Sequence, residues 1–245
     1  MKDGIRASDA WRVWWVTQAG PRHLAESVEN QDHASGRRGR EMLSLVVADG
    51  VGSCSQAREG ARAAVSSVVS VGRAIRADGP SGREFATRLM EEWNRRIPAM
   101  TRHDHGTTAL WCLLPARGLA QFGQIGDGVV AWGLRDGSVH ALHWPADRDS
   151  FQNETRSISS AVCADDWYLA TVDVSLIHWV LCATDGISDD IHPHAWAEFG
   201  GQLARLSERF SATTCARVAR RMLIDWPRPC HTDDKSLAFA LRTAS

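Results

Sequence analysis

Short apolar runs and period-2 alternation cover most of this chain, and four longer stretches have the 3.6-residue period of a helix. Strands are predicted at residues 11–18, 42–48, 109–114, 119–125, 129–134, 138–144, 168–174, 177–183 and 236–241. Helices are predicted at residues 56–75, 81–96, 194–209 and 212–224. Ser81 with Glu84 three residues later is a capping-box pair that fixes the start of the second helix.

The order of these elements predicts how they pack. Asp136-Gly137 between two apolar runs is a hairpin signal, and hairpins argue against a parallel, doubly wound sheet. Two antiparallel sheets stacked face to face, each covered outside by a helix pair, would bury every apolar stripe. The fold class is therefore α+β, a four-layer α/β/β/α sandwich, with residues 1–245 forming a single domain.

Three polar stretches separate the predicted elements. Residues 20–27 look like a loop, and the basic cluster at 37–40 looks like a solvated hairpin tip within a polar stretch. Residues 145–166 are polar and irregular, and a connection of this length is either a functional flap or a disordered loop.

Composition narrows the function classes. Apolar residues make up 44% and charged residues 23% of the chain, as in soluble globular proteins. The net charge of -1 favours neither nucleic acid nor an anionic membrane as a partner. No apolar run is long enough to span a bilayer, and no signal peptide is evident. The six cysteines form no Cys-x-x-Cys pair, which argues against zinc and fits reduced thiols in the cytoplasm.

Aspartates recur where the predicted strands begin or end. Asp49-Gly50 follows the run 42–48, and Asp185-Gly186 follows 177–183. Asp234 precedes the last strand, and Asp32 lies in a polar stretch after the first. A lone Asp-Gly is usually only a turn. Because strands of a sandwich end along a common edge, however, these four aspartates are expected to crowd together.

Crowded carboxylates repel one another and take up protons unless a cation compensates them. Oxygen ligands without cysteine favour Mg²⁺ or Mn²⁺ over Zn²⁺. Two such ions about 3.5–4 Å apart can share a bridging water that attacks phosphorus in line. The aspartates therefore point to metal-dependent phosphoester hydrolysis.

Six short motifs then show a resemblance to a known family. They are Asn30-Gln31-Asp32, Val47-Ala48-Asp49-Gly50-Val51-Gly52, Gly106-Thr107-Thr108, Gly126-Asp127-Gly128, Ala183-Thr184-Asp185-Gly186-Ile187 and Asp233-Asp234-Lys235-Ser236. In this order and spacing they resemble the metal-dependent protein phosphatases, the 2C-type serine/threonine phosphatases, in a divergent bacterial branch. The resemblance implies the same four-layer sandwich with a binuclear Mn²⁺ or Mg²⁺ centre between its sheets.

The resemblance also implies roles by position. Asp49 would bridge the two ions, and the Gly50 carbonyl would bind one of them. Asp185 and Asp234 would ligate the first ion, and Asp32 would bind the second mostly through water. The expected catalytic residues are therefore Asp49, Asp185 and Asp234.

Two further aspartates could serve a third, weaker ion of the kind found in bacterial members. Asp189 matches its ligand, and Asp127 would assist. Thr107 and Thr108 are expected to be structural residues at the base of the cleft.

Three departures from the family pattern affect substrate binding. Ser27 stands where the family commonly has an arginine that grips the substrate phosphate, and Arg22, then His23, are the nearest replacements. Val51 stands where many members have a histidine proposed as a general acid. Lys235 replaces the usual asparagine and could supply positive charge near the ions or point to solvent.

Other polar groups have plainer explanations. His103 and His105 flank Asp104 like a site, but a loop entering a strand is equally expected to be polar. His192 and His194 fit a helix entry. Asp233 is either a support for the site or a turn former.

The expected function is hydrolysis of phosphoserine and phosphothreonine in proteins by a cytoplasmic, monomeric enzyme. Its partners would be a phosphorylated protein and a cognate serine/threonine kinase, with no nucleic acid and no membrane. The alternative, motivated by Ser27 and Lys235, is a pseudophosphatase that binds a phosphoprotein or kinase without turnover.

Overall fold

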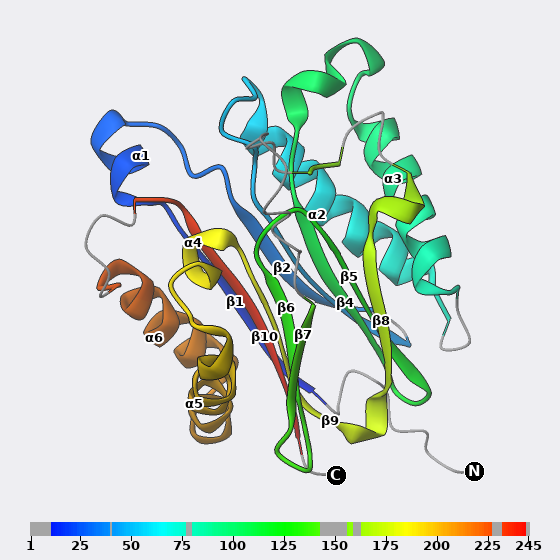
Figure 1. Ribbon diagram of the computed structural model, residues 1–245, viewed down its shortest axis with the longest axis vertical. Helices are drawn as coiled ribbons and strands as arrows, with labels where there is room; N and C mark the ends of the chain where they lie inside the picture. Colours follow the sequence, from blue (N-terminus) through cyan, green and yellow to red (C-terminus); the bar gives the residue numbers. More distant parts are fainter. Residues whose placement is uncertain are drawn as a thin grey trace.

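Two five-stranded antiparallel sheets form the middle of the computed structural model, which describes residues 11–39, 41–76, 80–142, 156–158, 163–226 and 232–243 (Figure 1). The first sheet has the order β1 (Trp11–Gln18), β10 (Lys235–Arg242), β9 (Ile177–Ala183), β6 (Val129–Leu134) and β7 (Val139–Leu142). The second has the order β2 (His33–Arg38), β3 (Met42–Ala48), β4 (Ala109–Pro115), β5 (Leu119–Ile125) and β8 (Tyr168–Asp173).

A pair of long helices covers the outer face of each sheet. The helices α2 (Ala57–Ala74) and α3 (Gly82–Arg96) pack on the second sheet, and α5 (Trp196–Arg209) and α6 (Ala212–Ile224) pack on the first (Figure 1). These four layers confirm the predicted sandwich. None of the helices in the described ranges is long and apolar enough to cross a bilayer.

The remaining helical segments are short. They are α1 (Pro21–Glu26), α4 (Asp185–Ser188) and the 3-10 helices η1 (Ala99–His105), η2 (Ala164–Asp166), η3 (Val174–Leu176) and η4 (Pro193–Ala195).

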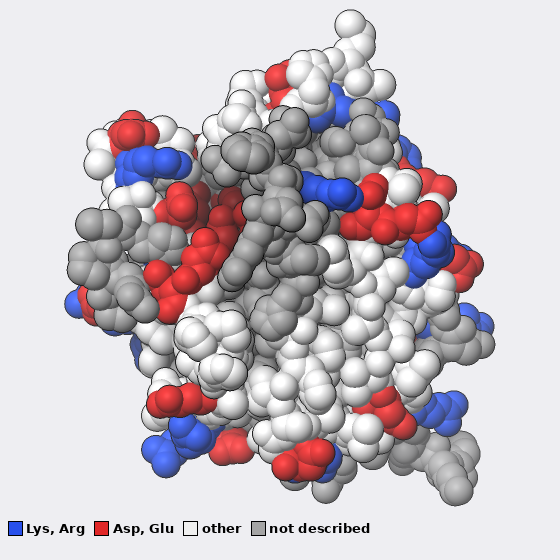
Figure 2. Space-filling model, viewed as in Figure 1, with Lys and Arg blue, Asp and Glu red and all other residues white. Residues whose placement is uncertain are grey.

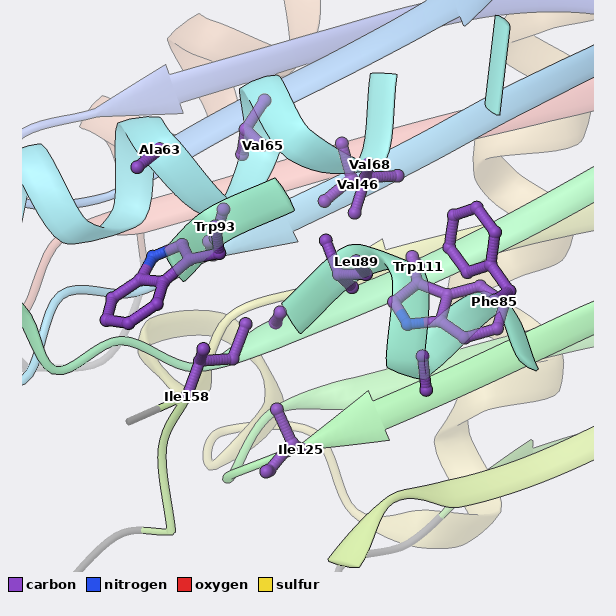
Figure 3. Packing of buried hydrophobic residues seen from close by; sticks show 14 of the residues in the cluster. Val46, Ala63, Val65, Val68, Phe85, Leu89, Trp93, Trp111, Ile125 and Ile158 are labelled. Carbon is purple, nitrogen blue, oxygen red and sulfur yellow. The ribbon is translucent and has the colours of Figure 1, made fainter. Parts of the chain in front are cut away.

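Three apolar layers hold the sandwich together, one between the sheets and one under each helix pair. Figure 3 shows the layer under α2 and α3, where Phe85 and Leu89 of α3 point toward Trp111 of β4. The rings of Phe85 and Trp111 are 4.5 Å apart. Between the sheets, Cys112 and Cys182 are fully buried, with their sulfurs 3.3 Å apart. Each layer buries apolar area, the main favourable contribution to folding.

Tryptophans fill these layers by lying against glycines. Trp14, Trp111, Trp132 and Trp179 are all buried. A Cβ atom on Gly133 or Gly200 would lie 2.3 Å from the Trp179 ring, and one on Gly123 would lie 2.2 Å from the Trp111 ring. The absence of a side chain at these glycines is therefore what lets the large rings pack flat.

Two segments differ from the prediction. Residues 20–27, expected as a loop, contain the helix α1, which begins with Pro21 and ends at Ser27 in a left-handed conformation with φ 56°. The polar residues 33–38 form the strand β2 at the edge of the second sheet. An edge strand is held by backbone hydrogen bonds to its neighbour, here β3, and these need no apolar pattern in the sequence. The basic residues at its end lie beside the β2–β3 turn, as expected, where Gly39 N–H donates to the Met42 carbonyl at 2.7 Å.

Most of the predicted irregular segment 145–166, including Asn153-Glu154-Thr155, lies outside the described residues. Within its described part, Ile158 forms a β-bridge with Thr107, and residues 164–166 form η2. The capping box of Ser81 and Glu84 at the start of α3 is confirmed.

The glycine–tryptophan packing yields a stability prediction. We expect Gly200→Ala to lower the free energy of unfolding by about 1–3 kcal/mol, because its new methyl group would collide with the buried Trp179 ring. Gly201→Ala is the matched control in the same helix, where the nearest atom is the flexible Arg205 guanidinium at 3.5 Å. Urea denaturation of both variants measures the difference, and equal stabilities would contradict this packing role.

Candidate functional site

The strand-end aspartates meet around a cavity of about 180 Å³ at one end of the sandwich. Its lining residues are Arg22, His23, Gln31, Asp49, Gly50, Val51, Gly52, Asp185, Asp233 and Asp234. Figure 2 shows acidic side chains gathered along a hollow on this face, with a basic group at one edge. The lining comes from both sheets, since Asp49 follows β3 and Asp185 follows β9. Stacking the sheets therefore brings together residues more than 130 positions apart in the chain.

Two threonines fix the backbone at Asp49. Thr107 Oγ1 donates to the Asp49 carbonyl at 2.8 Å, and Asp49 N–H donates to Thr108 Oγ1 at 2.9 Å. Both threonines are buried, which confirms their predicted structural role. Gly50 must be glycine, since a Cβ there would lie 2.5 Å from the Ala57 backbone. The Asp49-Gly50 turn is thus rigid and closely packed against α2.

Three donors surround the Asp234 carboxylate. Gly20 N–H donates to Oδ1 at 2.7 Å, while Gln31 N–H at 2.6 Å and His23 Nδ1 at 2.9 Å both approach Oδ2. Only 4% of Asp234 is exposed. The close approach requires Gly20, because a Cβ there would lie 2.1 Å from the Thr232 carbonyl oxygen. Neither Gly20 nor Gln31 was among the predicted site residues.

Asp32 is held at one oxygen and left open at the other. Its Oδ2 accepts from Thr184 Oγ1 at 2.8 Å, and the same hydroxyl oxygen accepts from Ser236 N–H at 3.0 Å. Its Oδ1 is buried and has no hydrogen-bond donor. The Asp49 carboxyl is its acidic neighbour and can donate to Asp32 only while Asp49 itself is protonated. With both acids ionised, a buried oxygen of Asp32 therefore has no partner.

The electrostatics of the cluster follow from this crowding. Burial, followed by the charges of Asp127 and Asp32, raises the pKa of Asp185 to about 8. Burial, which outweighs the lowering by hydrogen bonds to Asp49 and Thr184, raises the pKa of Asp32 to about 6. Burial, followed by Asp32 and Asp185, raises the pKa of Asp49 well above its usual range. Without a cation, the cluster therefore holds protons at neutral pH.

The donor set fits hard divalent cations, although the oxygens are not drawn together. Within the described ranges, no three His, Cys, Asp or Glu side chains form a ready-made metal-binding group. The reason is visible in the hydrogen bonds, since Asp32 and Asp234 are turned toward protein donors. The orphaned Asp32 Oδ1 and the raised carboxyl pKa values are nevertheless the features that a bound cation would relieve, and oxygen-only ligands suit Mg²⁺ or Mn²⁺.

The other predicted site residues lie at varying distances from the cavity. Asp189 is exposed at the end of α4, and its charge raises the pKa of Asp185. Asp127 acts on the same pKa more strongly, so it belongs to the acidic cluster. Arg22 is half-exposed at the rim, with Nη2 3.7 Å from Asp233 Oδ1. Lys235 is buried outside the lining, where Nζ donates to the Asp233 carbonyl at 3.0 Å.

Histidines outside the lining have structural contacts. His105 is buried, with Nδ1 2.7 Å from the Thr101 carbonyl oxygen, and His103 pairs with Asp104 on the surface. His192 accepts from His194 N–H at 3.4 Å at the start of η4, which fits the predicted helix-entry role.

A family model that matches most of the sequence identifies the family of this chain. A model of the protein phosphatase 2C family matches residues 19–223, which include the cavity aspartates other than Asp233 and Asp234. This chain belongs to the protein phosphatase 2C family. A sequence search of curated proteins gives no significant match.

Solved structures share the fold of this protein phosphatase 2C chain at low identity. Serine/threonine phosphatase Stp1 from Staphylococcus aureus is 12% identical over 100% of both chains, with a TM-score of 0.69. The photosystem II phosphatase PBCP is 13% identical over 96% of this chain and 100% of its own, with a TM-score of 0.65. RsbX, solved in complex with magnesium, is 11% identical over 95% of this chain and 96% of its own, with a TM-score of 0.59.

The raised carboxyl pKa values predict how the stability of this phosphatase-family chain depends on pH. An unfolded aspartate has a pKa of about 3.9, so between about pH 4 and pH 8 the folded, metal-free protein binds more protons than the unfolded chain. Its stability should therefore fall as pH rises through this window, as the folded protein loses the protons that its raised carboxyl pKa values hold.

Thermal melts in EDTA across this pH range measure the effect. The Asp185→Asn variant, which cannot ionise, should show a shallower fall than the wild type. Parallel pH profiles for the two proteins would contradict the raised pKa of Asp185.

Proposed function

We propose that this chain is a phosphoprotein phosphatase that uses two Mn²⁺ or Mg²⁺ ions to hydrolyse phosphoserine and phosphothreonine. The observation that carries the proposal is the largely buried carboxyl cluster of Asp32, Asp49 and Asp185, which lacks enough protein donors to be fully ionised at neutral pH. A cluster that opens on a cavity and needs positive charge suits divalent ions and the phosphoryl oxygens that such ions bind.

The proposed ligand roles follow from the resemblance of the six sequence motifs to the family pattern. Asp49 would bridge the two ions from its rigid turn, with the Gly50 carbonyl on one of them. Asp185 and Asp234 would hold the first ion, and Asp32 the second. We propose Asp49, Asp185 and Asp234 as the catalytic residues.

Asp189 and Asp127 are the proposed residues for a third ion. Their charges already act on Asp185, which supports their nearness to the cluster.

The chain's own residues then position the substrate. When bound, divalent ions supply charge for the phosphoryl oxygens and a water of lowered pKa for attack on phosphorus. Arg22, at the cavity rim, is proposed to bind the substrate phosphate by leaving its partly exposed ion pair with Asp233. A guanidinium suits this role because it can bind phosphate through two N–H groups. Lys235 is proposed to add positive charge near the ions from outside the cavity lining, while its Nζ donates a hydrogen bond to the Asp233 carbonyl.

Several finer features stay predictions. The substrate would be a phosphorylated protein, with a serine/threonine kinase as the opposing partner. We also propose that residues 1–245 act as one domain, as a monomer, in the cytoplasm.

A pseudophosphatase that binds a phosphoprotein without turnover is the second candidate. It is favoured by Ser27, which stands in place of the usual phosphate-binding arginine and closes α1 instead. It is also favoured by Asp234, whose oxygens already accept three hydrogen bonds.

The phosphatase proposal predicts metal-dependent turnover that requires Asp49. We expect hydrolysis of p-nitrophenyl phosphate and a phosphothreonine peptide in Mn²⁺, and none after EDTA treatment. Asp49→Asn should lower kcat at least about 100-fold, because bound ions supply several kcal/mol of transition-state stabilisation and 1.36 kcal/mol is tenfold in rate. Asn keeps the size of Asp49 but removes its charge.

The matched control is Asp136→Asn, which alters another Asp-Gly pair on the exposed β6–β7 hairpin. This variant should keep wild-type turnover. A folded wild type that binds phosphopeptide but shows no turnover in Mn²⁺ would favour the pseudophosphatase, and full activity of Asp49→Asn would refute the assignment of the site.

A further inference from the structure

The helix α1 and the residues on either side of it enclose Asp234 almost completely. An ionised carboxylate has about four lone-pair directions, two on each oxygen. In Asp234, Oδ2 accepts from Gln31 N–H and His23 Nδ1, and Oδ1 accepts from Gly20 N–H. One direction on Oδ1 is therefore left for any other partner.

His23 is the only one of these three donors that belongs to a side chain. Its exposed fraction is 8%, and the ring lies at the cavity wall. Because Asp234 Oδ2 is an acceptor, Nδ1 must carry the hydrogen in this bond. The His23 ring therefore donates this hydrogen bond to the Asp234 carboxylate.

The backbone around His23 is fixed on both sides. The His23 carbonyl accepts from Val28 N–H at 2.8 Å, which closes the helix. Arg22 N–H donates to the Thr232 carbonyl at 3.3 Å, so α1 is joined to the segment that leads into Asp234. The imidazole is consequently held at a set distance from Asp234.

We propose that His23 is a positioning residue for metal binding, which fixes Asp234 so that Oδ1 alone turns to the ion as a single-oxygen ligand. This inference rests on the proposed function, in which Asp234 is a metal ligand. Without the Nδ1–H donor, the backbone N–H groups of Gly20 and Gln31 alone would hold the carboxylate, so its orientation would be fixed less firmly, and one buried lone pair of Oδ2 would lose its partner. Metal binding would then have to order the side chain and would be weaker.

Calorimetric titration with Mn²⁺ alone tests this role without relying on turnover. We expect His23→Ala to weaken Mn²⁺ binding by about 10–100-fold, the range found when a residue that orients a metal ligand is removed. His23→Asn should recover most of the affinity, because its side-chain amide can place an N–H near the position of Nδ1. His23→Gln should not, because its amide lies one bond farther from the backbone.

The matched control is His105→Ala, which removes another histidine with 8% exposure and one Nδ1 hydrogen bond, outside the cavity lining. It should lower the melting temperature of the metal-free protein while leaving Mn²⁺ affinity unchanged. A purely structural role for His23 would give the same result for His23→Ala. Should His23→Ala fail to fold, the contrast between the Asn and Gln variants decides the question.

The failures of the two proposals are distinguishable. If the wild type binds Mn²⁺ and Asp49→Asn does not, but His23→Ala binds like the wild type, the role of His23 is refuted and the metal centre stands. Equal affinities of the Asn and Gln variants would also refute it. If the folded wild type binds no Mn²⁺ at all, the proposed function itself is refuted, and the role of His23 with it.

Discussion

Repulsion among buried carboxylates is the constraint on which the active end of this protein depends. Asp32, Asp49 and Asp185 are drawn from both sheets into one largely buried group, and each has a raised pKa because burial and its neighbours disfavour its charge. A folded chain can tolerate such a group in two ways, by keeping protons on it or by binding cations. The family match and the all-oxygen character of the group favour cations.

The rest of the fold gives this group a rigid base. Apolar layers on both sides of each sheet, filled by tryptophans lying against glycines, fix where the strands end. Buried hydroxyls then fix the acids locally, as Thr107 and Thr108 do for the Asp49 backbone and Thr184 does for Asp32. Neutral hydroxyls and backbone N–H groups can hold carboxylates in place without removing their need for positive charge.

The sequence predicted the layers and the acidic residues, because both leave local patterns. Within the part of the chain that the structure describes, period-2 and 3.6-residue patterns located nine of the ten strands and the four long helices, and Asp-Gly pairs at strand ends marked Asp49 and Asp185. The strand β2 was missed because its residues are polar and show no strand pattern. It forms a strand because its backbone pairs with β3. The short helix α1 was missed because six residues are too few to show a helical period.

The surroundings of Asp234 could not be predicted for a different reason. Two of its donors are backbone N–H groups, which every residue except proline possesses, so nothing in the sequence distinguishes Gly20 or Gln31 as donors. The one sequence feature that reflects this arrangement is the glycine at position 20, where the structure leaves no room for a Cβ atom. His23 was recognised as a polar residue near the site, but its contact with Asp234 arises from the α1 geometry that the sequence did not predict.

An anomalous-scattering map from crystals grown with Mn²⁺ would show whether the carboxyl cluster holds metal ions. If the cluster binds cations, a peak should lie in the cavity at about 2.1 Å from a carboxylate oxygen of Asp49, with Asp185 on the same ion. A fully Mn²⁺-equilibrated crystal with no peak there, or with Asp49 and Asp185 in separate surroundings, would contradict it.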